Sequence, residues 1–228
     1  RLAGSIGKSF PERVSALGGR SIDLHQIHQP FSFSRVERQA AAMAELVKQR
    51  QVRAVGVSNF NEKRMRAAHH RLAEEGVPLA TNQMRFSLID REIESNGVLD
   101  AARELGVSII AYSPLAQGIL TGKFHGEKDI RESKGPRKHL KRFKPKGLEA
   151  TRPVVDLLRR IGDTHGATPA QIALAWTVQR HDRLVVAIPG ASSARQAESN
   201  AGALEIRLSG PELAELADAG AEAERRLK

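Results

Sequence analysis

Short apolar runs alternate with segments of helical periodicity along most of the chain. Five runs have the length and composition of buried β-strands, and they span residues 22–27, 54–57, 79–83, 107–112 and 184–188. Apolar spacings of three and four predict helices over residues 5–19, 36–50, 62–75, 96–105, 151–165 and 194–203, and two more that open at Thr168 and Ser209. This alternation predicts an α/β protein with a parallel sheet, either doubly wound or part of a (β/α)8 barrel.

Local signals mark the ends of several predicted helices. Thr168 is followed by Pro169 and then by Gln171, which is the pattern of an N-cap, a first helical residue and a capping-box partner. Gly106 follows the helix at 96–105, and glycine readily adopts the left-handed conformation that ends many helices. These boundaries are therefore predicted more sharply than the others.

The composition excludes several classes of protein. Hydrophobic residues make up 40% and charged residues 27% of the 228 positions, which is typical of a folded globular chain. The absence of cysteine excludes disulfides, thiolate metal sites and a cysteine nucleophile, and it is compatible with the cytoplasm, where we expect the protein. No apolar run is long enough to span a membrane, and residues 1–10 lack the apolar stretch of a signal peptide.

Positive charge is concentrated in one segment of the chain. Residues 123–146 contain ten Lys and Arg against three Asp and Glu, whereas the formal charge of the whole chain is +10. Glycine and proline in this segment predict an exposed basic loop, inserted at 123–150, that either binds phosphate groups or is a solvated excursion. We expect no nucleic-acid partner, because only Phe124 and Phe143 offer aromatic rings for stacking and no binding motif is present.

Polar residues follow the predicted strands. Ligands bind at the carboxyl ends of the strands in parallel α/β folds, so a set of polar residues at that edge predicts a ligand site. The set includes a histidine, amides, hydroxyls and an aromatic residue, at His28, Ser58, Asn59, Asn82, Gln83, Tyr112, Ser113 and Ser192.

Five motifs carry these residues in a recognisable order: IDLHQIHQP (22–30), RAVGVSNF (53–60), TNQMRFSLIDR (81–91), AYSPLAQGILTGKF (111–124) and AIPGASSARQAESNAGAL (187–204). In order and spacing they resemble the aldo-keto reductases over nearly the whole chain. The resemblance implies a (β/α)8 TIM barrel that uses NADP(H) to interconvert carbonyls and alcohols. It therefore implies an oxidoreductase with a small-molecule carbonyl or alcohol substrate.

The resemblance gives His28 the role of the histidine in the family's Asp–Tyr–Lys–His tetrad, which orients and polarises the substrate carbonyl. An imidazole N–H can donate to the oxygen that gains negative charge during hydride attack. For an isolated histidine the alternative is a hydrogen-bonded core residue. Strand alternation turns the neighbouring His25 to the opposite face, where we expect a structural role.

The resemblance also implies a complete set of cofactor contacts. Ser58, Asn59 and Gln83 match residues that bind the nicotinamide carboxamide, and Tyr112 matches the aromatic residue on which the nicotinamide ring stacks. The loop over the pyrophosphate contains Ser113, Leu115, Gln117, Gly118 and Lys123. The residues that match contacts to the adenosine end of NADP(H), including its 2′-phosphate, are Ser192, Arg195, Gln196 and Asn200. No acid lies among residues 191–195, which favours NADP over NAD, whereas Ser199 stands where the family commonly has an acid.

Three tetrad members have no match. In the family the Asp and Tyr follow the second barrel strand and the Lys ends the third, but only 21 residues precede Ile22 here, without a strand pattern or a tyrosine. Lys8 lies in a predicted helix, and we do not assign it as the catalytic lysine. We therefore expect barrel strands four to eight of an N-terminally incomplete member, with unpaired sheet edges and impaired turnover. The alternative is a non-catalytic NADPH-binding or regulatory protein on the same scaffold.

Overall fold

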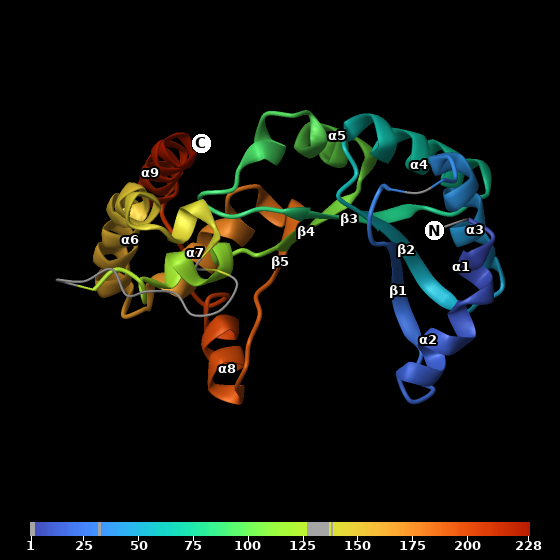
Figure 1. Ribbon diagram of the computed structural model, residues 1–228, viewed down its shortest axis with the longest axis horizontal. Helices are drawn as coiled ribbons and strands as arrows, with labels where there is room; N and C mark the ends of the chain where they lie inside the picture. Colours follow the sequence, from blue (N-terminus) through green and yellow to red (C-terminus); the bar gives the residue numbers. More distant parts are fainter. Residues whose placement is uncertain (1–2, 32, 127–136, 138) are drawn as a thin grey trace. The chain divides into compact units, whose positions relative to one another are not determined.

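The protein is described from a computed structural model, which covers residues 3–31, 33–126, 137 and 139–228 (Figure 1). Its strands are β1 (Ile22–Ile27), β2 (Val52–Ser58), β3 (Leu79–Arg85), β4 (Ser108–Tyr112) and β5 (Val185–Ile188), and the order in the sheet is β1-β2-β3-β4-β5. A doubly wound sheet reverses its strand order at a switch point, whereas strands in barrel order follow the sequence. The α/β class and a five-stranded parallel sheet consistent with part of a (β/α)8 barrel are thus confirmed.

Helices separate the strands along the chain. They are α1 (Ser5–Lys8), α2 (Phe10–Ala16), α3 (Val36–Lys48), α4 (Glu62–Glu74), α5 (Val98–Leu105), α6 (Pro145–His165), α7 (Pro169–Gln179), α8 (Ala194–Gly202) and α9 (Gly210–Leu227). Short 3-10 segments are η1 (Glu92–Glu94), η2 (Ala116–Thr121), η4 (Lys141–Phe143) and η5 (Asp182–Leu184). The chain divides into two compact units: unit 1 is Arg1–Met84 with Ile93–Ile110, and unit 2 is Arg85–Glu92 with Ala111–Lys228.

The core of unit 1 forms where helices α3 and α4 pack against the strands. Val55 and Val57 of β2 are buried, as are Met43 and Leu46 of α3. On β1, the ring of His25 meets that of Phe10 edge-on, with 5.6 Å between the ring centres. Burial among these groups lowers the pKa of His25 below its ordinary value, and the nearby Arg13 adds to the effect. His25 packs against Phe10 within unit 1, but it also lines a cavity along β1 that His28 shares, so the two histidines are not separated as strand alternation predicted.

Gly56 allows β2 and β3 to approach closely. The register of the two strands is irregular between Val55 and Gly56. A Cβ at Gly56 would fall on the Thr81 hydroxyl and lie 3.0 Å from the Thr81 carbonyl oxygen. The amide of Gln26 on β1 donates to the Thr81 hydroxyl at 3.1 Å, so side chains of β1 and β3 meet over this glycine of β2. Any larger residue must push these groups apart.

The core of unit 2 is built around Trp176 on α7. Its ring lies 5.7 Å from that of Phe86, and its indole N–H donates to the Leu213 carbonyl at 3.1 Å. The predicted capping box of Thr168 with Gln171 is present, and the structure adds a second one, Ser209 with Glu212, at the start of α9. Ser209 donates to the Glu212 carboxylate from its hydroxyl and its backbone N–H, which lowers the pKa of Glu212 to about 2.

Two predicted boundaries were wrong. The helix expected at 151–165 begins at Pro145, so part of the predicted 123–150 loop is helical, and Lys141–Phe143 adds a 3-10 turn. The basic side chains obscured an apolar face, because Leu148 and Phe143 are buried. Residues 127–136 and 138 of that loop lie outside the described residues.

The second wrong boundary lies near the start of the chain. The helix expected at 5–19 is two helices, α1 and α2, that meet at Ser9. Pro11 stands in the first turn of α2, where its missing N–H has no intrahelical acceptor to lose, and this favours a new helix start.

Replacing Gly56 by Ala tests the close approach of β2 and β3. We expect Gly56→Ala to lower the free energy of unfolding by about 1–3 kcal/mol, since overpacking forces neighbouring atoms to shift. Urea unfolding followed by far-UV circular dichroism measures the change. Gly7→Ala, at a glycine with nothing within 4 Å of the new methyl group, is the matched control and should be neutral or slightly stabilising. Equal stability of the two variants would contradict the prediction.

Candidate functional site

His28 follows the carboxyl end of β1 directly. Ile27 pairs with Val57, so the next position in this register sets His28 beside Ser58. The imidazole is exposed, and it lines a cavity of about 840 Å³ that runs along β1. Phe31, whose side chain is 80% exposed, lines the same cavity. His28 thus occupies a place where a small molecule can reach its ring nitrogens.

The structure brings the three predicted carboxamide-binding residues together in unit 1. The Ser58 hydroxyl donates to the Gln83 carbonyl at 3.1 Å, and the Asn59 N–H donates to the same oxygen at 2.9 Å. The side-chain amide of Asn59 donates to the Ser58 hydroxyl at 3.0 Å. Asn59 has a φ of 60°, in the left-handed region that asparagine tolerates better than most residues. Asn59 and Gln83 are each only half-buried, so part of each residue reaches solvent.

Asn82 stabilises the turn after β2, which contains Asn59. Its side chain is fully buried, and its amide donates to the Phe60 carbonyl at 2.8 Å while its oxygen accepts from the Phe60 N–H at 3.4 Å. Asn82 therefore pairs both backbone groups of the residue after Asn59. The sequence grouped it with the strand-end polar residues, but the structure gives it a structural role.

Tyr112 ends β4, and its carbonyl accepts from the Phe86 N–H at 3.4 Å. The guanidinium carbon of Arg85 lies 5.8 Å from the centre of the Tyr112 ring, within the range of a cation–π interaction. Arg85 has no assignment from the sequence, although it stands inside the TNQMRFSLIDR motif. A cation on the Tyr112 ring could not be deduced, because the two residues meet only through the packing of the strands.

The loop after Tyr112 has an unusual backbone. Ser113, Ala116 and Gln117 have φ values of 54°, 47° and 58°, all in the left-handed region that side chains other than glycine seldom adopt. The turn closes on itself, because the Gly118 N–H donates to the Leu115 carbonyl at 2.8 Å. Such strain is commonly kept at binding sites, where the surrounding structure holds it in place.

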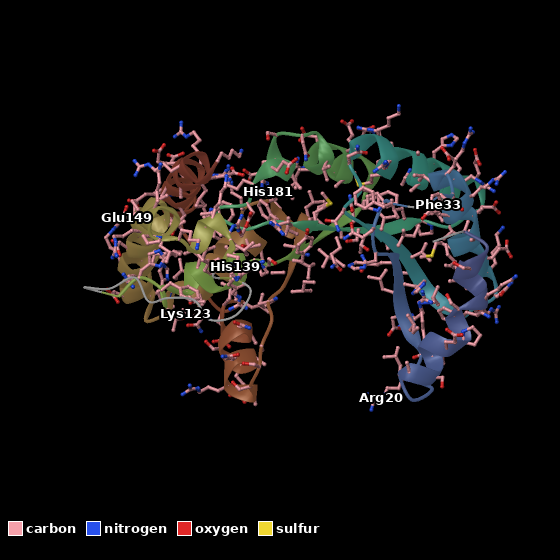
Figure 2. All side chains as sticks on the ribbon, in the orientation of Figure 1. Arg20, Phe33, Lys123, His139, Glu149 and His181 are labelled. Atoms are coloured by element: carbon pink, nitrogen blue, oxygen red, sulfur yellow. The ribbon has the colours of Figure 1, made fainter. Side chains whose placement is uncertain are left out.

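Two polar groups of this loop offer contacts to a ligand. A Cβ at Gly118 would lie 3.0 Å from the Lys123 side chain, so the lysine folds back over the loop, and its Nζ lies 5.0 Å from the Phe124 ring centre (Figure 2). Among the described residues, the buried side-chain oxygen of Gln117 has no hydrogen-bond partner. A cationic amine, an unsatisfied amide and tightly turned backbone fit a phosphate-bearing group with hydroxyls.

His125 lies beneath the start of the basic segment. Its Nε2 is 2.9 Å from the Thr151 hydroxyl and 3.1 Å from the Leu148 carbonyl, both on α6. Burial, with the cationic Arg152 and Arg159 nearby, lowers the pKa of His125, although its bond to the Leu148 carbonyl works in the opposite direction. The charge of the surrounding sequence concealed this buried neutral histidine.

The residues predicted for the adenosine end lie at the start of α8. Ser193 is the N-cap and accepts from the Gln196 N–H at 3.3 Å. The Gln196 side-chain oxygen accepts from the Ser192 N–H at 2.8 Å and the Ser192 hydroxyl at 2.9 Å, so these two predicted residues are in contact. Arg195 is exposed in the first turn, whereas Asn200 is half-buried further along the helix. The helix start thus combines backbone N–H groups with a cation.

The part of the chain that the structure describes contains neither a cluster of metal-binding side chains nor a membrane-spanning helix. No three His, Asp or Glu side chains there are grouped as metal ligands. No described helix has both the length and the apolar character to cross a membrane.

The sequence profile of the Aldo/keto reductase family matches residues 3–221. The chain belongs to the aldo/keto reductase family.

Individual relatives support the membership. Aldo-keto reductase str7 of Strobilurus tenacellus is 36% identical over 203 residues, or 88% of this chain and 58% of the relative. L-glyceraldehyde 3-phosphate reductase of Escherichia coli K12 is 32% identical over 212 residues, or 91% of this chain and 61% of the relative. The structure of glycerol dehydrogenase from Gluconobacter oxydans matches with a TM-score of 0.83 and 26% identity, covering 96% of this chain and 64% of that one. The chain therefore spans about three-fifths of the length of these curated relatives.

Removing the Asn82 side chain tests its structural role. Asn82→Ala leaves the N–H and carbonyl of Phe60 buried without their partner, which we expect to lower the free energy of unfolding by about 1–3 kcal/mol. Urea unfolding followed by circular dichroism measures the change. Gln49→Ala removes an exposed amide and should be within about 0.5 kcal/mol of the unaltered protein. A neutral Asn82→Ala variant would show that the clamp is not needed.

The lowered pKa of His125 makes the stability of unit 2 depend on pH. Below the ordinary histidine pKa the unfolded chain binds a proton that the folded chain resists, so stability falls between about pH 7 and pH 5. We expect His125→Gln to lose less stability over this interval, as reported by fluorescence of the single, buried Trp176 during urea unfolding. His139→Gln, at an exposed histidine of the same segment (Figure 2), should behave as the unaltered protein. Identical pH profiles for all three would contradict the prediction.

Proposed function

We propose that the protein is an NADP(H)-dependent oxidoreductase that interconverts aldehydes or ketones and alcohols. The observation that carries the proposal is the cluster of Ser58, Asn59 and Gln83 at the carboxyl ends of two paired strands in an aldo/keto reductase chain. The carboxamide of a nicotinamide has N–H donors and an oxygen acceptor. The half-buried residues Asn59 and Gln83 have amide oxygens to accept from it and amide N–H groups to donate to it. When bound, NADPH supplies the hydride that reduces the carbonyl carbon.

His28 would act on the oxygen of the substrate carbonyl. Its imidazole is exposed and lies beside the carboxamide cluster in the register of β1 and β2, which puts an N–H donor next to the reacting carbonyl. A donor to that oxygen stabilises the negative charge that grows on it. The cavity along β1 gives a small carbonyl compound access to the ring.

In unit 2, Tyr112 would be the flat surface for the nicotinamide ring, which fixes the face that is presented to the substrate. The loop of Ser113, Leu115, Gln117 and Gly118, with Lys123, would hold the pyrophosphate. The folded-back lysine supports this assignment, because its ammonium can pair with a phosphate, whereas the unsatisfied Gln117 oxygen could accept from a neighbouring ribose hydroxyl.

The start of α8 would bind the 2′-phosphate of NADP(H). Arg195 supplies a cation, Ser192 a hydroxyl, and the helix start its N–H groups, while Gln196 and Asn200 would contact the adenine. No acid stands among residues 191–195 to prefer a free 2′-hydroxyl, so NADP(H) is favoured over NAD(H). The cysteine-free sequence is compatible with work in the cytoplasm.

The names of two similar proteins suggest the size and polarity of the substrate. One relative is called L-glyceraldehyde 3-phosphate reductase and one neighbour glycerol dehydrogenase, both names of small polar carbonyl or alcohol compounds. We propose a substrate of that size, which the cavity beside His28 would accommodate.

A non-catalytic NADPH-binding or regulatory protein is the second candidate. Tyr112 is the single tyrosine of the sequence, and its proposed role under the nicotinamide leaves no tyrosine among the 228 residues to donate a proton to the product oxygen. Loss of such a donor often costs about 10²–10⁴-fold in rate. Cofactor binding without turnover of any carbonyl compound would favour this candidate.

The cofactor preference has a direct test at Arg195. We expect the unaltered protein to bind NADPH more tightly than NADH, and Arg195→Gln to reduce that preference by about tenfold, because it removes a charged partner of the 2′-phosphate. Fluorescence titration of both cofactors measures the dissociation constants, and parallel assays with short aldehydes report turnover. Arg160→Gln, at an exposed arginine of α6 that pairs with Glu215, is the matched control and should leave the preference unchanged. Failure of the unaltered protein to bind either cofactor would refute the proposed function.

A further inference from the structure

Arg85 lies over the ring of Tyr112, the residue on which we propose that the nicotinamide stacks. Its guanidinium carbon is 5.8 Å from the ring centre, and its side chain is 46% exposed. Both residues belong to unit 2, so the contact is internal to one compact unit. The arrangement sets a permanent positive charge on the residue that we propose as the nicotinamide platform.

The charge of Arg85 is only weakly compensated. Its Nη1 lies 4.0 Å from the Asp90 carboxylate, at the outer limit of an ion pair. Asp90 accepts two shorter hydrogen bonds, at 2.8 and 3.0 Å, from Arg142. Arg142 therefore takes most of the negative charge of Asp90, and Arg85 keeps a net positive field over the ring.

This charge distinguishes the two redox states of a nicotinamide. The oxidised ring is a cation, and the reduced ring is neutral. A tyrosine face by itself attracts cations and would favour the oxidised ring. A guanidinium already bound to that tyrosine opposes a second cation, whether it stays beside the ring or moves aside, because like charges this close repel each other.

We propose that Arg85 biases the Tyr112 platform toward reduced cofactor, so that it is a specificity-determining residue for the redox state of the nicotinamide. The inference rests on the proposed function, because it requires a nicotinamide to stack on Tyr112. Its consequence concerns occupancy and release: the site would hold NADPH in preference to NADP⁺, and the oxidised cofactor would leave more readily after the reaction.

The test measures two dissociation constants for each protein variant. NADPH is titrated by its own fluorescence, and NADP⁺ by displacement of bound NADPH. We expect the ratio of the dissociation constants, NADP⁺ over NADPH, to fall about 3- to 10-fold in Arg85→Gln, which removes the charge but keeps a polar side chain. Arg85→Lys keeps the charge and should retain most of the ratio.

Arg160→Gln makes the same change in net charge on the exposed face of α6, and it should leave the ratio as in the unaltered protein. A second readout is the dependence on salt. Raising the salt concentration to about 1 M shortens the reach of charges to a few ångströms, and it should lower the ratio of the unaltered protein more than that of Arg85→Gln.

The outcomes distinguish a failure of the proposed function from a failure of the role proposed for Arg85. If the unaltered protein binds neither NADPH nor NADP⁺, the proposed function fails and the inference fails with it. If both cofactors bind but Arg85→Gln and Arg160→Gln give the same ratio, the proposed function stands and the role of Arg85 is overturned. An equal response to salt in the unaltered protein and in Arg85→Gln would overturn that role as well.

Discussion

The parallel ladder of β1, β2 and β3 is the constraint on which the candidate site in unit 1 depends. Its register sets the carboxyl ends of the strands at one edge of the sheet, and the polar residues that follow each strand come together there: His28, Ser58 and Gln83. Gly56 permits the close approach of β2 and β3, and Asn82 holds the turn after β2 by pairing with backbone. The binding groups are therefore positioned by residues that would contact no ligand.

In unit 2, the carboxylate of Asp90 positions the charged groups around the proposed cofactor platform. Asp90 accepts a two-pronged hydrogen bond from Arg142 on the 3-10 turn and lies within ion-pair range of Arg85 at the end of β3. Since a carboxylate shared by two guanidiniums cannot neutralise both, one keeps positive charge, and that one rests on Tyr112. A structural ion pair thus sets the electrostatic environment of the proposed cofactor platform.

Predictions that depend on local chemistry were confirmed. The capping box at Thr168, the helix start at Ser209 and the left-handed Gly106 after α5 are present, because each depends only on residues a few positions apart. The predicted start of α6 was wrong. The basic side chains of the neighbouring residues indicated a loop, whereas the burial of Leu148 depends on distant parts of unit 2. His125 escaped notice for the same reason: a buried, neutral histidine cannot be recognised inside a strongly basic segment.

The sequence by itself determined the α/β class, the five strands and their polar carboxyl ends, and its motifs indicated the family that the profile then confirmed. These properties follow from periodicity and from short motifs, which act over neighbouring residues. The tertiary structure confirmed the barrel-like strand order that periodicity had left open and the motifs implied. Only the tertiary structure separated the structural Asn82 from its neighbour Gln83 and set Arg85 on Tyr112. Those features depend on strand register and on contacts between residues far apart in the chain, and hydrophobic periodicity carries no information about either.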